Sequence, residues 1–360
     1  MVKYFVFMNR GEILKIGIPR ALYFYVYYPM WYGFFSSLGH EIKLSVPTNK
    51  EIINLGVSHS VDDICISVKV FHGHVKYLLD KKDVDFVFVP RIASEEKYKY
   101  TCPKLAALPD LMKSAFVSDT NRILTATFYT RQGEKPIVKA FEEIERQLGD
   151  SDEKIKMAVK MGIRYQKLAV KSLRSGHTFL DVVKNIRDLD SLIKKPVQKQ
   201  RYTVALAGFP YDVYDTFTNG DVISKLEDSG VGIVTTDMLD PKVYKHYSKY
   251  MIKDLFWYQA NAAAKGGMYY IDSPDIDGVI SISSFNCGIS SIYQKLLDLY
   301  SKEIGKPVMH IIVDEQTGDA GLATRIEAFI DLIRVKRGDG LVAQTNNLHG
   351  TEDGVHVRSL

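Results

Sequence analysis

Short apolar runs alternate with longer helix-like stretches along the first part of the chain. The apolar runs cover residues 13–18, 42–46, 63–67 and 84–89. Runs of this length, bounded by Gly, Pro or polar residues, are typical of buried strands, and the stretches between them are long enough for helices. We therefore predict four strands connected by helices. This order of elements favours a mainly parallel sheet with helices on both faces.

The second part of the chain repeats this pattern. Apolar runs at 202–207, 231–235, 278–283 and 308–313 are again separated by helix-like segments. The first run of each part ends in a glycine followed closely by a proline: Gly17 and Pro19 in the first, Gly208 and Pro210 in the second. This correspondence indicates a duplicated Rossmann-like unit.

A charged, helix-permissive stretch at 142–195 separates the two parts and shows no strand pattern. The predicted fold is therefore α/β, with two Rossmann-like lobes that contain mainly parallel sheets and are joined by a helical segment. We place the first lobe at 1–117, the helical connection at 118–200 and the second lobe at 201–336. The glycine-containing, polar remainder at 337–360 lacks periodicity and is predicted to be a loosely ordered tail.

Composition narrows the class of protein. The chain has 360 residues, of which 46% are hydrophobic and 25% charged, and its formal net charge is +4. The basic residues are interleaved with acidic ones, so we expect no nucleic-acid partner. No apolar run reaches the roughly 18 residues of a membrane span, and residues 1–8 lack a signal-peptide cleavage site. We therefore predict a cytoplasmic protein without a membrane partner.

The chain has three cysteines, Cys65, Cys102 and Cys287. Their odd number, with no export signal, argues against a pure disulfide framework, and the absence of a Cys-x-x-Cys pair argues against zinc ribbons, ferredoxins and thioredoxins. Three alternatives stay open on spacing alone: unrelated buried thiols, a zinc site completed by His72 or His74, and an iron–sulfur cluster.

The three cysteines share one kind of predicted position. Cys65 and Cys287 each stand between an apolar run and a helix-like segment, and Cys102 precedes Pro103, a favourable first residue of a helix. Ligand sites of parallel α/β sheets lie beyond the carboxyl ends of the strands, where helix N-termini favour negative charge. We therefore expect the thiols to meet in the cleft between the lobes, two from the first lobe and one from the second.

Five motifs of the chain belong together: DDICISVKVFHGHV at 62–75, VPR at 89–91, TCPKLAALPD at 101–110, SFNCG at 284–288 and DEQTGDAGLATRIEAF at 314–329. In combination they resemble the 2-hydroxyacyl-CoA dehydratase superfamily, in particular its branch related to acyl-CoA dehydratase activases. The resemblance spans roughly residues 15 to 333. It implies a [4Fe–4S] cluster held by Cys65, Cys102 and Cys287, and a related branch with a double-cubane cluster leaves that variant open.

The resemblance also implies a function. Relatives receive electrons from a separate ATP-dependent activator and carry out low-potential reductase or dehydratase chemistry on acyl-CoA thioesters. The resemblance also leaves open whether the protein forms an oligomer, whether another electron donor serves it and whether its substrate is another small molecule. The chain has no P-loop, and its only glycine-rich candidate is at 317–321, so we favour the cluster-bearing component over the ATPase. Two alternatives remain: a non-catalytic iron–sulfur electron carrier or assembly component, and a cluster-free two-lobed small-molecule binding protein.

Other charged residues stand close to the predicted site. Lys69, Lys104 and Arg91 are candidates to offset the charge of a cluster or to bind a phosphate, with solvated surface positions as the alternative. Asp314 and Glu315 are candidates for proton transfer, although a structural role such as pairing with Arg325 is favoured for them.

Overall fold

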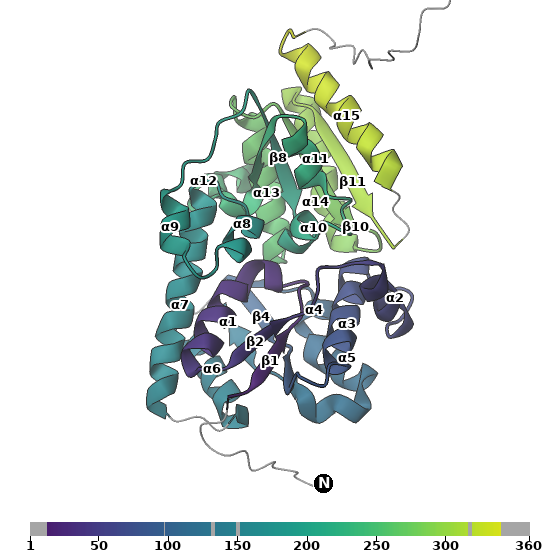
Figure 1. Cartoon of the computed structure of the whole chain (residues 1–360). Helices are drawn as coiled ribbons and strands as arrows, with labels where there is room; N and C mark the ends of the chain where they lie inside the picture. Colours follow the sequence, from purple (N-terminus) through teal and green to yellow (C-terminus); the bar gives the residue numbers. More distant parts are fainter. Residues whose placement is uncertain (1–12, 97, 131–133, 149–151, 316–318, 340–360) are drawn as a thin grey trace, which may run out of the picture.

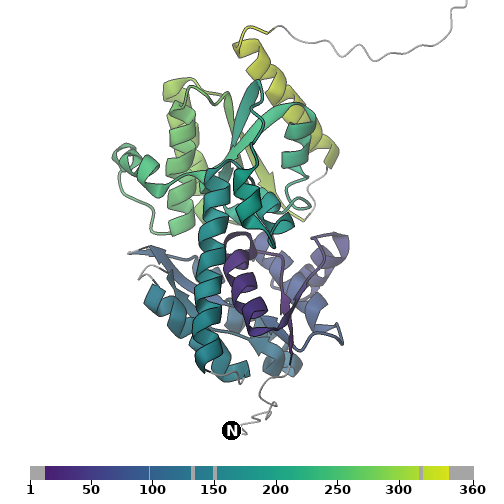
Figure 2. The ribbon, with the colours of Figure 1, turned by 60° about the vertical axis from the view of Figure 1, so that its left-hand side comes forward.

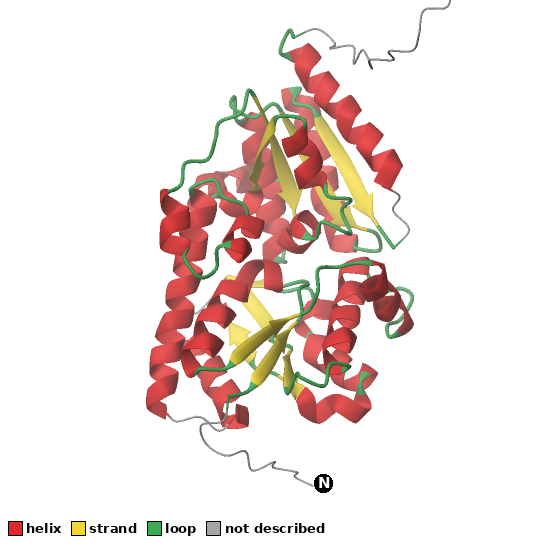
Figure 3. Ribbon diagram, in the orientation of Figure 1, coloured by secondary structure: helices red, strands yellow, loops and turns green. Residues whose placement is uncertain are grey.

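The computed structural model describes residues 13–96, 98–130, 134–148, 152–315 and 319–339. The chain forms two α/β lobes, and the long helix α7 (Asp152–Arg174) runs along their side (Figures 1 and 2). Helices flank the sheets of both lobes (Figure 3). The predicted α/β class with mainly parallel sheets is confirmed. No helix in the described ranges is both long and apolar enough to cross a membrane.

The first lobe is built on a four-stranded parallel sheet in the order β2-β1-β3-β6. Its central strand, β1, is buried, and Ile16 and Ile18 are completely inaccessible to solvent. The strands are β1 (Lys15–Ile18), β2 (Glu41–Leu44), β3 (Phe86–Phe88) and β6 (Ile123–Leu124). The helices are α1 (Phe24–Leu38), α2 (Lys50–Ser58), α3 (Ile66–Leu79), α4 (Pro103–Ala106), α5 (Leu108–Ala115), the 3-10 helix η1 (Val117–Arg122) and α6 (Glu134–Leu148).

The strand predicted at 63–67 does not form. Its first residues make a turn, and helix α3 begins at Ile66. The β-branched residues of this segment favour a strand locally, but α3 is buried on most of its circumference and tertiary packing outweighs that preference. Helix α2 crosses α3 so closely that a Cβ at Gly73 would come within 2.0 Å of the carbonyl oxygen of Ile52.

The second lobe repeats the topology of the first. Its parallel sheet has the order β11-β10-β8-β9. In both lobes the second strand lies on one side of the first, and the third and fourth lie on the other side. The strands are β8 (Tyr202–Gly208), β9 (Val231–Thr235), β10 (Gly278–Ser284) and β11 (Val308–Val313). The helices are α10 (Pro210–Tyr214), α11 (Val222–Asp228), η3 (Thr236–Met238), α12 (Pro241–Tyr244), η4 (Lys245–Tyr250), α13 (Tyr258–Asp272), α14 (Gly288–Ile304) and α15 (Asp319–Lys336).

The connection between the lobes is helical in its later part, where α7 is followed by α8 (Phe179–Lys184) and α9 (Leu189–Lys194). Its earlier part differs from the prediction. Strand β6, the last of the first sheet, lies beyond residue 117, within the segment expected to be helical. The predicted tail falls outside the described residues from position 340 onward.

A small three-stranded sheet, which the sequence did not predict, extends the first lobe toward the second. It has the order β5-β4-β7, with β4 (Arg91–Glu96), β5 (Lys99–Tyr100) and β7 (Thr127–Tyr129). The β4–β5 pair is antiparallel and β4–β7 is parallel. The Tyr100 amide donates to the carbonyl of Phe256 at 3.1 Å, and their rings stack at 4.9 Å. This sheet therefore ties the lobes together.

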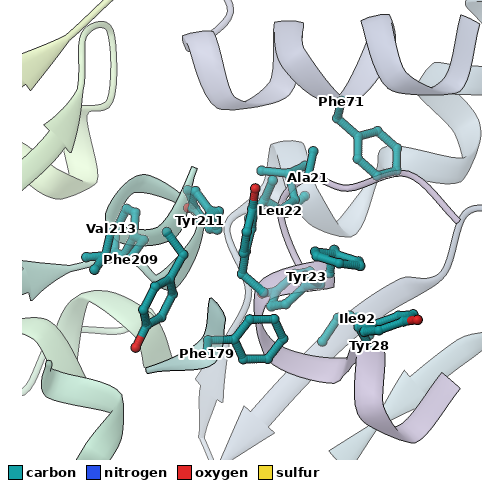
Figure 4. Close-up of a cluster of buried hydrophobic side chains, with 14 of the residues drawn as sticks. Ala21, Leu22, Tyr23, Tyr28, Phe71, Ile92, Phe179, Phe209, Tyr211 and Val213 are labelled. Atoms are coloured by element: carbon teal, nitrogen blue, oxygen red, sulfur yellow. The ribbon is translucent and has the colours of Figure 1, made fainter. Parts of the chain in front are cut away.

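Apolar side chains fill the junction of the lobes (Figure 4). Leu22 and Tyr23 follow β1, Phe209 and Tyr211 follow β8, and Phe179 comes from α8. All five are buried. At roughly 25 cal/mol per Å² of buried apolar surface, such a cluster favours a closed arrangement of the lobes.

Candidate functional site

The three cysteines line one cavity between the lobes. Cys65 and Cys102 belong to the first lobe and Cys287 to the second. The cavity walls are largely apolar or aromatic, and the free space between them is narrow, about 30 Å³. The other lining residues are Leu22, Tyr23, Ser67, Val68, Glu95, Tyr100, Thr101, Lys104, Leu105, Phe209, Tyr211, Trp257, Gln259, Ala260 and Ile289.

Each cysteine is the N-cap residue of a helix. Cys65 precedes α3, Cys102 precedes α4 with Pro103 at its first position, and Cys287 precedes α14. The long helices α3 and α14 direct the positive ends of their dipoles toward the thiols, which favours negative charge at the sulfur atoms. The placement at helix starts is as predicted, although Cys65 follows a turn rather than a strand.

Trp257, another helix N-cap residue, also lines the cavity. Trp257 caps α13, the helix that precedes β10, the third strand of its lobe. In the first lobe, α3 with its N-cap Cys65 precedes the third strand, β3. Cys102 and Cys287 each follow the third strand of their own lobe. The two lobes therefore contribute corresponding positions in pairs, and Trp257 stands where a fourth cysteine would complete the set.

The thiols influence one another electrostatically. Burial and, to a smaller extent, the neighbouring Cys287 raise the pKa of Cys65 to about 12, although the Val68 amide and the charge of Lys104 lower it. Burial also raises the pKa of Cys287, with additional contributions from Asp212 and Cys102. Cys65 and Cys287 are therefore protonated at neutral pH in the metal-free protein. A bound metal group would displace these protons.

A carboxylate lines the same cavity. Glu95 of β4 accepts hydrogen bonds from the Tyr23 and Tyr27 hydroxyls, both at 3.1 Å, and from the Gln259 amide of the second lobe at 2.7 Å. Burial raises its pKa to about 7, although the three donors lower it. Glu95 can therefore hold or release a proton near neutral pH.

A second carboxylate lies one hydrogen bond away from the cavity. Asp212 of α10 accepts from Ser284 at 2.6 Å and from Ser67 at 2.8 Å, so it joins the two lobes. Burial raises its pKa to about 7, against the lowering effect of the two serine hydroxyls. Its Oδ2 atom is buried and has no hydrogen-bond partner among the described residues.

The two histidines do not belong to the cavity. His72 Nδ1 is 2.9 Å from the Val68 carbonyl, and His74 Nε2 is 3.0 Å from the Thr48 hydroxyl. Both are buried, and neither lines the cavity. Burial, with a smaller effect of Arg20, lowers the pKa of His74 to about 3, so it stays neutral. Both are therefore packed, hydrogen-bonded helix residues, and a zinc site completed by either one loses its support.

Of the charged candidates, one lines the cavity and others pair with structural partners. Lys104 lines the cavity, whereas Lys69 is buried and pairs with Glu315 at 2.9 Å. Arg91 donates to Asp110 at 2.7 Å and to the Ala106 carbonyl, and so holds α4 against α5. Lys69, Glu315 and Arg91 therefore have structural partners. The Glu315 partner is Lys69 rather than the predicted Arg325, which donates to the His310 carbonyl.

A single metal ion does not fit the described geometry. Among the described residues, no group of three or more His, Cys, Asp or Glu side chains is arranged to hold one ion. A multi-iron cluster needs more widely spaced thiols than a single tetrahedral ion does, and three protonatable thiols around one cavity form a suitable donor set. Because the free space is only about 30 Å³, a cluster requires the cavity to widen.

Sequence reasoning missed Glu95, Asp212 and Trp257. Asp212 could have been singled out, because it lies two residues after the Pro210 that opens the second repeat. Comparing the repeats could also have pointed to Trp257, once α3 had been assigned as a helix. No local pattern distinguishes Glu95 from its exposed neighbour Glu96.

Comparison with known proteins identifies one family. The model of the family described as "CoA enzyme activase uncharacterised domain (DUF2229)" matches residues 15–239, more than half of the chain. The match covers Cys65 and Cys102 but ends before Cys287. No curated protein matches the chain.

Proposed function

Because the chain belongs to the CoA enzyme activase uncharacterised domain family, we propose that it is the iron–sulfur component of a CoA-enzyme activation or dehydratase system. In this proposal, Cys65, Cys102 and Cys287 bind a [4Fe–4S] cluster in the cavity between the lobes. The chain is then a partner of an ATP-dependent electron donor, as in the 2-hydroxyacyl-CoA dehydratase superfamily, and an acyl-CoA thioester is the expected class of substrate.

One observation carries the proposal. Three thiols that are 37 and 185 residues apart in the chain line a single cavity, each at a helix N-terminus. These three are the only cysteines in the sequence. Unrelated buried thiols have no physical reason to converge in this way, whereas helix N-termini and Lys104 compensate the negative charge that thiolate ligands carry.

The surrounding residues have defined tasks in this proposal. A [4Fe–4S] cluster supplies one-electron transfer when bound. The apolar walls exclude water, and Lys104 offsets negative charge. Glu95 lines the cavity with a pKa near neutrality and can exchange a proton there. Asp212 holds a second proton one hydrogen bond away, behind Ser67.

The decisive experiment is anaerobic reconstitution with iron and sulfide. We expect about four iron atoms and four sulfide ions per chain, and loss of most of this iron in Cys65→Ser, Cys102→Ser and Cys287→Ser. His72→Ala and His74→Ala are the matched controls and should retain the iron, because neither ring lines the cavity. A wild-type protein that binds no iron, or a triple serine variant that binds as much as wild type, would contradict the proposal.

The same preparation separates an enzyme from an electron carrier. With only three cysteines, one iron of a cubane lacks a cysteine ligand, and an open metal position is where substrates bind. Cyanide or an acyl-CoA thioester should then alter the electron paramagnetic resonance spectrum of the reduced protein. An unchanged spectrum would favour the non-catalytic electron carrier.

A further inference from the structure

A second cavity, of about 210 Å³, lies where both lobes meet the helical connection. The first lobe contributes Arg20, just beyond β1, and Thr48, just before α2. The second lobe contributes Asp215, just after α10, and helix α8 forms the remaining wall. The cavity shares no lining residue with the cysteine cavity. At about 30 Å³ per water molecule, it has room for about seven waters, or for a small organic molecule.

Opposite charges face this cavity without pairing with each other. Asp215 is buried, with 4% of its surface exposed. It accepts from the Thr48 hydroxyl at 2.6 Å and from the Thr218 amide at 3.1 Å. In the part of the chain that the structure describes, neither Arg20 nor Lys184 at the rim has an ion-pair partner. Arg20 instead lies over the Phe24 ring, at 5.8 Å from its centroid.

Aromatic rings form the wall between these charges. Tyr25 and Tyr214 both line the cavity and stack on each other at 6.4 Å, and the Tyr214 hydroxyl is engaged with Thr235 and Asp237. The pKa of Tyr25 is raised by burial and by Asp215, and lowered by Arg20, so its ring lies within the electrostatic reach of both charges. Stacked tyrosine faces also attract a cation.

We propose that this cavity binds a small α-amino acid as a zwitterion, with its carboxylate at Arg20 and its ammonium group at Asp215. Arginine presents donors in a planar fork that matches a carboxylate, and Lys184 adds a second positive charge at the mouth. The Asp215 carboxylate and the faces of Tyr25 and Tyr214 suit an ammonium group. The apolar side chains of Leu180, Val183 and Pro47 complete the walls for a ligand side chain.

Simpler ligands fit these charges less well. A plain anion satisfies Arg20 but is repelled by the buried Asp215, and a plain cation meets the reverse problem. A zwitterion bridges the two charges and offsets the cost of burying the Asp215 carboxylate. Because the ligand contacts both lobes and α8, it would stabilise their closed arrangement. The proposal does not depend on whether the cysteine cavity holds a cluster.

The test is thermal unfolding of the full chain with a panel of free amino acids. At a concentration about 100 times the dissociation constant, a ligand of the native state should raise the unfolding midpoint by several degrees. The same amino acids are then offered in N-acetylated form, which lacks the ammonium group, and as amides, which lack the carboxylate. We expect stabilisation only by ligands that carry both groups. Equal stabilisation by a blocked form, or none by any free amino acid, would overturn the proposal.

Variants assign the effect to this cavity. Arg20→Gln and Asp215→Asn should each weaken binding at least tenfold, because each leaves one ligand charge unpaired. Arg187→Gln, an exposed arginine near the end of α8 that does not line the cavity, is the matched control and should bind like wild type. Retained affinity in both cavity variants would place the binding site elsewhere and refute the assignment.

Discussion

At the scale of single residues, the carboxyl groups of Glu95 and Asp212 dominate the acid–base behaviour near the cysteine cavity. Glu95 is half-buried, and Asp212 has only 1% of its surface exposed. Both have pKa values raised to about 7, chiefly by burial. An acid whose folded-state pKa is raised binds its proton more tightly in the native state. Its favourable contribution to stability is therefore complete at low pH and is lost as the pH rises through the folded-state pKa.

We predict that Glu95→Gln changes the pH dependence of the free energy of unfolding of the metal-free protein. Between pH 4.5, the ordinary pKa of a glutamate, and pH 7, the pKa of Glu95 in the folded protein, the free energy of unfolding of the wild type should fall by about 1–3 kcal/mol relative to that of the variant. Glutamine keeps the size of the side chain but cannot ionise. Denaturant titrations at several pH values measure the difference.

Glu96→Gln is the control for this prediction, because Glu96 is the exposed neighbour on the same strand. Its free energy of unfolding should depend on pH in the same way as that of the wild type. If Glu95→Gln also showed the wild-type pH dependence, the Glu95 carboxyl would be solvated in the native protein.

Sequence reasoning reached some of these residues and not others, for physical reasons. The cysteines could be identified because helix starts have local signals, such as Pro103 directly after Cys102. Glu95 could not, because its burial depends on Tyr23 and on Gln259, which is 164 residues away. Whether a charged residue is buried depends on partners that are distant in the chain.

At the scale of elements, the contact between α2 and α3 determines where the Cys65 helix lies. Gly56 and Gly73 let the two helices approach so closely that their backbones touch. A Cβ at Gly56 would lie 2.1 Å from the Lys69 carbonyl oxygen, and one at Gly73 would lie 2.0 Å from that of Ile52. Backbone atoms cannot give way as the end of a flexible side chain can, so the helices would have to separate.

We predict that Gly73→Ala destabilises the protein by roughly 1–3 kcal/mol, since overpacking outweighs the better helix propensity of alanine. It should also lower the iron content after reconstitution, because α3 carries Cys65 at its start. Gly321→Ala is the matched control: nothing lies within 4 Å of a Cβ at this helical position, and the change should be neutral or slightly stabilising. An unchanged stability of Gly73→Ala would contradict this packing.

The elements also show where pattern reading fails. Strands that are buried along nearly their whole length, such as β8 and β10, were predicted to within a residue. Helix α3 was partly mistaken for a strand because it is buried on nearly all sides and so lacks the polar face that reveals a helical period. The β4–β5 pair was missed because its pairing depends on contacts with the second lobe rather than on a local turn signal.

At the scale of the whole molecule, an ion-pair network joins the lobes beside the cysteine cavity. Asp254 of the second lobe contacts Lys99 of β5 and Lys265 of α13, each at 2.7 Å. Both lysines are buried, and the Lys265 side chain is only 4% exposed. Burial raises the pKa of Asp254, but hydrogen bonds from the two lysines outweigh that effect and lower it to about 2.

We predict that Asp254→Asn destabilises the protein by about 2 kcal/mol at neutral pH, because it leaves two buried ammonium groups without a counter-charge. The partial exposure of Asp254 keeps the loss below that of a fully buried pair. The lobes should also separate more readily, which small-angle X-ray scattering would detect as a larger radius of gyration.

The control is Asp190→Asn, which removes an exposed partner of Arg164. It should change stability by less than about 0.5 kcal/mol. In the wild type, the Asp254 contribution should fade as the pH falls below its ordinary pKa of 3.8 toward 2. A variant as stable and as compact as the wild type would mean that the network does not hold the lobes together.

The repeated strand order has a consequence for the ancestry of the site. If one ancestral lobe had paired with a second copy of itself, every residue at the shared cavity would have occurred twice, and its thiols would have been even in number. Gene duplication and fusion free the two copies to diverge. An odd set of three cysteines, with Trp257 at the position that corresponds to Cys65, is the mark of such divergence. A single fused chain can acquire such an asymmetry at the Trp257 position of the cavity, whereas a symmetric homodimer cannot.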